Sequence, residues 1–220
     1  MKNLTYIYVF LLLGSISQIF AQQANKAKNL LDEVSNKMGA YTNMQIDFKS
    51  SLSNADAGIA EGDESPIIGS ITLEGEKYNL SYLGNNFLFD GKKLYIINHE
   101  EKEISTNDGD FDDTDGFIYP SKLLTFYKEG YNYKLGKSIK VKGKKIQIVV
   151  LTPIDSDSEI VKVELGIELK TKHIYKLTQL GANSAKTTFT ITSFKKNQQL
   201  QKDTFLFNKD TYLKKKYSID

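Results

Sequence analysis

The chain has 220 residues, with 29 basic and 27 acidic side chains, a net charge of +2 and no cysteine. A charge this close to balance argues against a nucleic-acid partner, and the lack of cysteine excludes disulfides and a lipid anchor attached to cysteine. Every basic residue is a lysine, because the sequence contains no arginine.

Residues 1–21 have the pattern of a secretory signal peptide. Lys2 precedes an apolar run over residues 6–13, and the segment ends in the small residue Ala21. We expect cleavage after Ala21 and export into the periplasm. The apolar run is far shorter than the roughly 20 residues that cross a bilayer, so it does not predict a membrane span. Residues 22–220 contain no Pro-rich or Ser-rich linker and are interpreted as a single domain.

An amphipathic helix is the first element predicted after the signal peptide, over residues 24–41. Its apolar side chains recur three or four residues apart, and charged residues lie between them. Gly39, near the end of the pattern, is a residue type that commonly ends a helix. The apolar face of this helix includes Leu31, Val34 and Met38.

After the helix the hydrophobic period changes to two, which is typical of strands with one buried face. The clearest example is residues 161–170, where apolar residues alternate with lysine, glutamate and glycine. Turn signals such as Asp90-Gly91 and Lys142-Gly143 predict antiparallel hairpins between neighbours. Similar strand-like runs cover residues 45–52, 67–73, 78–83, 87–89, 94–98, 131–141, 145–151, 174–180, 187–194 and 205–207.

These runs predict a mainly β fold of about ten strands, with one further short helix over residues 121–127. A sheet of this size curls or closes, and two helices are too few to cover its apolar face. Two arrangements remain open at this point. A second sheet could pack on the first as a sandwich, or the sheet could form an unclosed half-barrel whose concave apolar face is available to a ligand.

An acidic stretch precedes the short helix and invites a calcium interpretation. Asp108, Asp110 and Asp112 alternate as the first ligands of an EF-hand loop do. Asp113, however, occupies the position that requires glycine, and Tyr119 the position that requires glutamate. We therefore interpret the stretch as an exposed connection and predict no metal site and no cofactor.

Catalytic motifs are also lacking. The histidines, His99 and His173, lie in or beside strand-like segments without an associated nucleophile motif, and the sequence has no Gly-x-Ser-x-Gly elbow. We predict that the protein is not an enzyme and has no catalytic residues.

Several short motifs follow one another in a characteristic order. The N-terminal helix leads into a strand with Asp47-Phe48, and a hairpin is predicted over residues 89–95. The remaining motifs are Gly69-Ser70-Ile71, Tyr78-Asn79-Leu80, Pro120 with Leu123-Leu124, Leu151-Thr152-Pro153 and Phe205-Leu206-Phe207. Over about residues 24–207, this order resembles the LolA-type periplasmic carriers of outer-membrane lipoproteins.

The resemblance implies an unclosed antiparallel barrel with helices over its open side as a lid. It also implies a soluble carrier that receives acylated lipoproteins from an inner-membrane ABC-type transporter and takes them toward the outer membrane, where the acceptor is unknown. In that family an arginine inside the barrel is associated with the closed lid, and this chain has no arginine. We expect a monomer whose lid is held by a weak, bistable contact.

Alternation along the strands selects the side chains expected to line the lipid-chain cavity. From the sheet these are Phe48, Ile71, Leu73, Tyr78, Leu80, Tyr82, Phe89, Leu94, Ile96, Val163, Leu165 and Ile167. From the lid and the helix face they are Leu31, Val34, Met38, Leu123, Leu124 and Tyr127. Ordinary core packing is the competing interpretation of each, because a register slip of one residue moves a whole strand's set to the other face.

Two alternatives to a lipoprotein carrier remain at the level of sequence. The same fold could carry another amphiphile, such as a glycolipid or a pigment precursor. The chain could also be an exported adhesion or scaffold module whose β core is fully packed.

Overall fold

Strands begin where the hydrophobic period changes. In the computed structural model, which describes residues 22–109 and 118–220, a helix covers residues 22–39 and all the long strands follow it. The first half of the chain contributes β1 (Met44–Asn54), β2 (Ile67–Glu74), β3 (Lys77–Tyr82), β4 (Asn85–Phe89), β5 (Lys93–Asn98) and β6 (Glu103–Asp108). The second half contributes β7 (Tyr131–Val141), β8 (Lys144–Pro153), β9 (Ile160–Glu168), β10 (His173–Gly181), β11 (Ala185–Lys196) and the short β12 (Ser218–Ile219).

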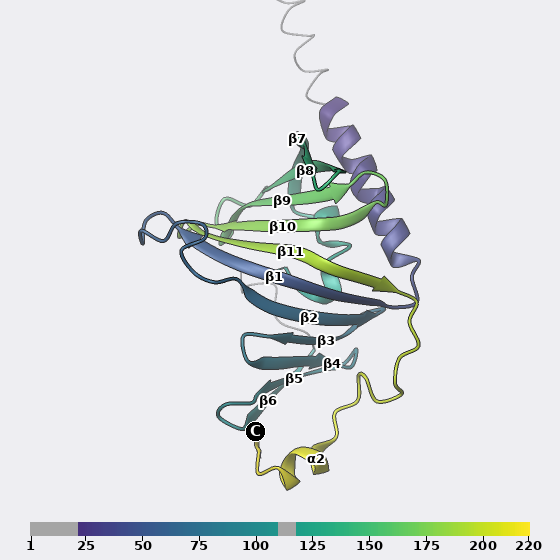
Figure 1. Ribbon diagram of the computed structural model, residues 1–220, viewed down its shortest axis with the longest axis vertical. Helices are drawn as coiled ribbons and strands as arrows, with labels where there is room; N and C mark the ends of the chain where they lie inside the picture. The colour runs from purple at the N-terminus through teal and green to yellow at the C-terminus, as the bar shows by residue number, and fades with distance from the viewer. Residues whose placement is uncertain (1–21, 110–117) are drawn as a thin grey trace, which may run out of the picture.

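All twelve strands belong to one sheet, with the order β12-β6-β5-β4-β3-β2-β1-β11-β10-β9-β8-β7. Two antiparallel meanders, β1 to β6 and β7 to β11, meet where β1 pairs with β11. The outer strands β7 and β12 do not pair with each other, so the sheet is open. Figure 1 shows the strands stacked from β7 at one end to β6 at the other, in a strongly curved sheet. This is the unclosed antiparallel arrangement that the sequence predicted.

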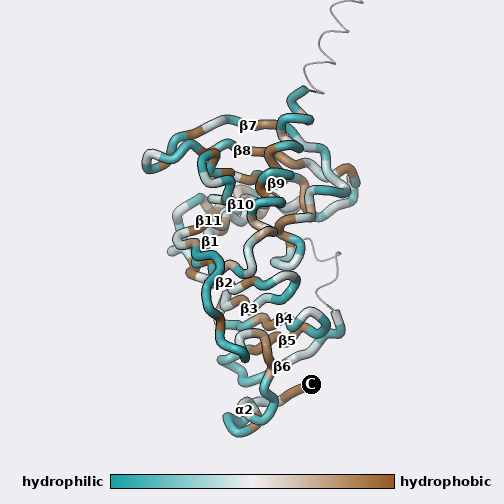
Figure 2. The backbone as a smooth tube through the Cα atoms, turned by 90° about the vertical axis from the view of Figure 1, so that its right-hand side faces the viewer, coloured by the Kyte–Doolittle hydropathy of each residue, from teal (hydrophilic) through white to brown (hydrophobic). Residues whose placement is uncertain are grey.

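One face of the sheet carries the main hydrophobic core. Along β1 the side chains of Met44, Ile46 and Phe48 are buried and alternate with more exposed neighbours. The register places Ile71 of β2 opposite Ile46, and Leu80 of β3 opposite Ile71, so the apolar set continues from strand to strand. The apolar positions recur along the strands from β7 to β6 in Figure 2. The N-terminal helix packs its buried residues into the same core. We call this the concave face.

The connection from β6 to β7 has to join the two ends of the sheet, because these strands lie near opposite edges. Its described part, residues 118–130, packs against the concave core through Tyr127, with Leu123 and Phe126 partly buried there. We call residues 118–130 the crossover segment. It contains two short 3-10 turns, η1 (Pro120–Lys122) and η2 (Phe126–Lys128).

The predicted helix over residues 121–127 is therefore replaced by these two turns. Thr125, which lies between them, has a φ of −127° and a ψ of −20°, outside the helical region. The helix is interrupted there, and the segment crosses the sheet as two short turns.

The C-terminal segment returns over the opposite face. Phe207 stacks on Tyr95 of β5 at 4.1 Å and on Tyr212 at 5.3 Å between ring centroids. A short helix, α2 (Lys209–Lys214), follows, and β12 then pairs in parallel with β6. Figure 1 shows α2 at the end of the molecule far from β7. A second, smaller core forms here, in which Leu88, Ile97, Ile104 and Phe205 are buried.

The observed strands differ from the predicted set in two details. The sheet has twelve strands rather than about ten, because β6 and β12 carry few apolar residues and gave no clear alternation. Residues 205–207 form no strand. Phe205 is buried, Leu206 is 65% exposed and Phe207 is half-buried, so these side chains pack on the sheet without joining its hydrogen-bond ladder.

Within the described residues, none of the helices has the length and apolar character needed to cross a membrane. The predicted signal peptide, residues 1–21, lies outside the described part of the chain.

Candidate functional site

An apolar pocket of about 120 Å³ lies between the concave face and the crossover segment. The sheet contributes side chains from five strands, and the crossover segment covers them with three residues. The lining consists of Ile46, Phe48, Ile71, Leu80, Tyr82, Ile118, Pro120, Leu123, Ile174, Leu177, Gln179, Phe189 and Ile191. Such a lining offers few hydrogen bonds to a polar ligand and favours a hydrocarbon.

Aromatic rings form the floor of this pocket. The Phe48 ring lies 5.6 Å from that of Tyr82 and 5.7 Å from that of Phe189, between centroids. Gly69, opposite Phe48 on β2, makes room for the Phe48 ring, because a Cβ at Gly69 would lie 2.3 Å from Phe48 Cζ. Close approach of a ring to a strand therefore requires glycine at this position.

The polar atom of Tyr82 is satisfied within the sheet. The hydroxyls of Ser50 and Tyr82 are hydrogen bonded at 2.7 Å, and Ser50 itself is buried. This bond compensates a group whose burial would otherwise be costly. The Tyr82 ring can thus present its apolar body to the pocket.

A hydrogen bond joins the crossover segment to the N-terminal helix. The hydroxyl of Tyr127 donates to Asp32 Oδ1 at 2.8 Å, and Tyr127 is only 3% exposed. Lys28, one helical turn before Asp32, pairs with the same carboxylate at 2.7 Å. We call Tyr127 and Asp32 the latch.

The electrostatics of the latch favour its formation. The hydrogen bond from Lys28, followed by that from Tyr127, lowers the pKa of Asp32. Burial, followed by the bond to the Asp32 carboxylate, raises the pKa of Tyr127 to about 12. The carboxylate is thus kept ionised and the phenol protonated, which are the states that the bond requires.

A larger and more polar cleft, of about 990 Å³, lies along the crossover segment and shares Ile118 with the apolar pocket. Its apolar members include Phe89, Phe126, Tyr131 and Ile160. Charged side chains surround them, namely Glu76, Lys122, Lys128, Glu129, Asp155, Asp157 and Glu159. The crossover segment therefore contacts an apolar pocket and also borders a polar cleft.

The structure places the predicted cavity residues at three locations. Five of them line the apolar pocket: Phe48, Ile71, Leu80, Tyr82 and Leu123. Most others pack in the same core without lining that pocket. The buried ones in the concave core are Leu31, Val34, Met38, Leu73, Tyr78, Leu94, Tyr127, Val163, Leu165 and Ile167. Partly buried against this core are Ile96 and Leu124. Phe89 lines the larger cleft.

Sequence reasoning did not select several lining residues from β10 and β11, such as Leu177, Phe189 and Ile191. These strands were predicted, and their alternation was visible. Their position beside Phe48 depends on the pairing of β1 with β11, in which Phe48 is opposite Ile191. A contact between residues so distant in the chain leaves no local pattern.

The residues weighed for metal binding and catalysis have structural contacts. Asp108 pairs with Lys93 at 3.2 Å, whereas Asp110, Asp112 and Asp113 lie outside the described residues. His99 is hydrogen bonded to the hydroxyl of Tyr217 at 2.9 Å. Over residues 22–109 and 118–220, no group of three or more His, Asp or Glu side chains is placed to hold a metal ion.

The other histidine, His173, lies in the sheet near the N-terminal helix. It is hydrogen bonded to the hydroxyl of Tyr41 at 2.8 Å, and its ring centroid lies 4.2 Å from that of Phe194. These contacts tie the end of the helix to β10 and β11.

No protein-family model and no curated protein matches the chain, but solved structures do. An uncharacterised conserved protein from Thermus thermophilus is 11% identical over 89% of this chain and 98% of its own, with a TM-score of 0.58. A putative outer membrane lipoprotein-sorting protein domain from Vibrio parahaemolyticus is 14% identical over 86% and 99%, with a TM-score of 0.47. A LolA superfamily protein from Nitrosomonas europaea is 12% identical over 84% and 98%, with a TM-score of 0.43. At these identities the likeness concerns the fold alone.

Proposed function

We propose that this protein is a non-enzymatic periplasmic carrier that shields the acyl chains of lipoproteins. It would receive them from an inner-membrane ABC-type lipoprotein-releasing transporter and move them toward the outer membrane. The observation that carries this proposal is the apolar pocket between the concave face and the crossover segment. The open sheet supports it, because an unclosed barrel can widen without breaking strand pairs.

The energetics of an acyl chain explain why such a pocket is needed. Burial is worth about 0.8 kcal/mol per methylene, so exposing a chain of about 16 carbons to water costs on the order of 12 kcal/mol. Carriage through an aqueous compartment therefore requires a cavity that excludes water from the chain.

In the structure the pocket is small. Its volume of about 120 Å³ is below the roughly 300–1,000 Å³ of sites that enclose a ligand. We infer that cargo enters when the crossover segment moves away from the sheet. A hydrogen bond such as the latch contributes only about 1–3 kcal/mol net, much less than the burial of one acyl chain, so entering cargo can displace it.

The test is to purify the protein from the periplasm of its native cells and to identify by mass spectrometry what accompanies it. Acylated lipoproteins at about one per protein are the expected result. A free glycolipid or pigment precursor instead would reassign the cargo to another amphiphile. A protein that is always empty and also fails to bind a fluorescent fatty-acid analogue would contradict any carrier function and favour a packed structural module.

A further inference from the structure

A groove of about 880 Å³, different from the apolar pocket and from the larger cleft, lies where β1, β9, β10 and β11 meet the hairpin of β7 and β8. Lys49, Thr190 and Lys176 line it and are neighbours across β1, β11 and β10. They alternate with Phe48 and Leu177, which point into the concave core. These three side chains therefore point away from the concave core, whereas Ile174 and Ile191 line both the groove and the apolar pocket.

Positive charge is concentrated in this groove. Five lysines line it, Lys49, Lys142, Lys144, Lys176 and Lys196, against the single carboxylate of Glu168. With His173 neutral this is a local excess of four positive charges, whereas the whole chain carries only +2. The rest of the chain therefore has a net charge of −2, and the groove stands out from a balanced surface.

Few of these charges are neutralised by the protein. Lys144 pairs with Glu168 at 2.9 Å. The ammonium of Lys196 lies 4.6 Å from the centre of the Tyr41 ring. Within the described residues, Lys49, Lys142 and Lys176 form no ion pair. Three cations are thus available to a ligand, in a groove whose volume is within the range of ligand sites.

The hairpin geometry helps to place two of the lysines. Lys142 and Gly143 form the turn between β7 and β8, with φ values of +48° and +81°. Left-handed backbone at both positions is the conformation of a tight two-residue hairpin. It brings Lys142 and Lys144 to the same end of the groove.

A neutral histidine is consistent with a positive local potential. Burial lowers the pKa of His173, and the nearby charges of Lys37 and Lys196 lower it further. Glu168 acts in the opposite direction but does not reverse the shift.

We propose that this lysine-lined groove binds a phosphate group, from either a lipid headgroup or a soluble phosphate. Lysine binds phosphate as a compact point charge, and in this chain without arginine the cations of the groove are all lysines. The hydroxyls of Thr171, Thr190 and Ser193 also line the groove and can add hydrogen bonds to phosphate oxygens. The lysines of this site do not line the apolar pocket, and phosphate binding there does not depend on the proposed carrier function.

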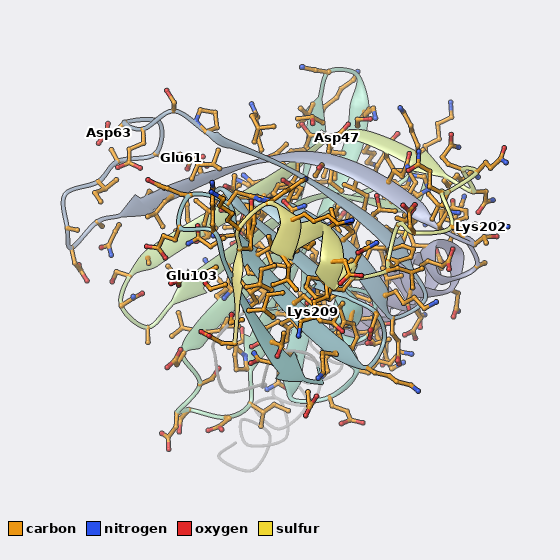
Figure 3. All side chains as sticks on the ribbon, turned by 90° about the horizontal axis from the view of Figure 1, so that it is seen from below. Asp47, Glu61, Asp63, Glu103, Lys202 and Lys209 are labelled. Carbon is orange, nitrogen blue, oxygen red and sulfur yellow. The ribbon has the colours of Figure 1, made fainter. Side chains whose placement is uncertain are left out.

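The test compares two triple variants with equal loss of charge. The groove variant carries Lys49→Gln, Lys142→Asn and Lys176→Gln. Asparagine is chosen at position 142 because it tolerates the positive φ. Lys144 is kept so that Glu168 remains paired. The control variant carries Lys202→Gln, Lys209→Gln and Lys214→Gln on exposed side chains of the C-terminal segment. Figure 3 labels Lys202 and Lys209 there.

Binding of inorganic phosphate is measured by calorimetry. Binding to vesicles is measured by flotation, with phosphatidylglycerol in phosphatidylcholine compared with phosphatidylcholine alone. We expect the groove variant to bind phosphate or anionic vesicles at least tenfold more weakly than the wild type. The control variant should bind less than twofold more weakly. Phosphate binding alone assigns a soluble source, and binding to anionic vesicles alone assigns a lipid headgroup.

Two results would overturn the proposal. One is a wild-type protein that binds neither phosphate nor anionic vesicles. The other is an equal loss in the groove and control variants, which would mean that only overall charge matters. If thermal unfolding shows that the groove variant does not fold, the single variant Lys49→Gln on an exposed side chain takes its place. This variant should bind phosphate or anionic vesicles at least threefold more weakly than the wild type does. An unchanged affinity would count against the site.

Discussion

The hydroxyl of Tyr127 donates a hydrogen bond to the carboxylate of Asp32 at 2.8 Å, and so connects the crossover segment to the N-terminal helix. Both elements cover the concave face, but neither is part of the sheet. Their connection therefore joins the two covering elements without contributing to the strand ladder. In this chain without arginine, we infer that the latch holds the crossover segment against the concave face.

Replacing Tyr127 with phenylalanine should weaken the closed state by roughly 1–2 kcal/mol, because the ring stays in the core while the bond to a charged acceptor is lost. We expect faster hydrogen exchange over residues 118–128 and faster uptake of a fluorescent fatty-acid analogue. Tyr131→Phe is the matched control, since the Tyr131 ring also packs on Phe126 but its hydroxyl makes no hydrogen bond with the described residues. Equal effects of both changes would show that the latch does not govern opening.

The latch should be insensitive to pH from about 5 to 9 and fail in acid. The pKa of Asp32 is lowered in the folded protein, so its contribution is present above the ordinary value of 3.8 and is lost as the pH falls through the lowered pKa. The pKa of Tyr127 is raised to about 12, so its contribution is full below the ordinary value of 10.0 and is lost only as the pH approaches 12.

Uptake rates of the fatty-acid analogue, measured for wild type and Tyr127→Phe from pH 3 to pH 9, check this prediction. The difference between the two proteins should be constant down to about pH 5 and should disappear in stronger acid. A difference that instead changes between pH 6 and 8 would point to His173 or another group.

Two adjacent leucines test which part of the crossover segment contacts cargo. Leu123 lines the apolar pocket, whereas Leu124 packs against the core without lining the pocket. We expect Leu123→Ala to weaken binding of the analogue more than it lowers stability, and Leu124→Ala to do the reverse. Affinity is read by fluorescence titration and stability by urea unfolding. The same ratio of losses in both variants would make the segment ordinary core.

The C-terminal segment should stabilise the far end of the sheet through Phe207. This ring is stacked between Tyr95 of β5 and Tyr212 of α2. Phe207→Ala should cost roughly 3 kcal/mol and accelerate hydrogen exchange in β6. Leu206→Ala, at a side chain that is 65% exposed, should cost less than about 0.5 kcal/mol. A stable Phe207→Ala protein would show that the segment is loosely attached.

Local patterns in the sequence were sufficient for most elements. The 3.6-residue period predicted the N-terminal helix, which covers residues 22–39, and the two-residue period predicted the strand from Ile160 to Glu168. The turn Lys142-Gly143 predicted the hairpin of β7 and β8. These features depend on neighbours in the chain, since backbone geometry repeats over a few residues. The resemblance to LolA-type carriers extended them to an open antiparallel sheet, which the structure confirms.

Segments whose structure depends on distant partners were not predicted correctly from the sequence. The strand β6 has few apolar residues; it pairs with β5 on one side and with β12 on the other, where Ile104 is buried opposite Ile219. The run over residues 205–207 looked like a strand, but its phenylalanines pack on the outer face. In both cases tertiary contacts outweighed the local preference.

The sequence by itself determined which side chains are apolar and which of them share one face of a strand, because successive side chains alternate between the two faces. Tertiary structure alone decided which of them line a pocket. Phe48 and Phe189 meet because β1 pairs with β11, and the crossover segment covers them because β6 and β7 lie near opposite edges. Only the folded chain brings Tyr127 to Asp32 and five lysines to one groove, since such contacts arise from strand order and not from spacing along the chain.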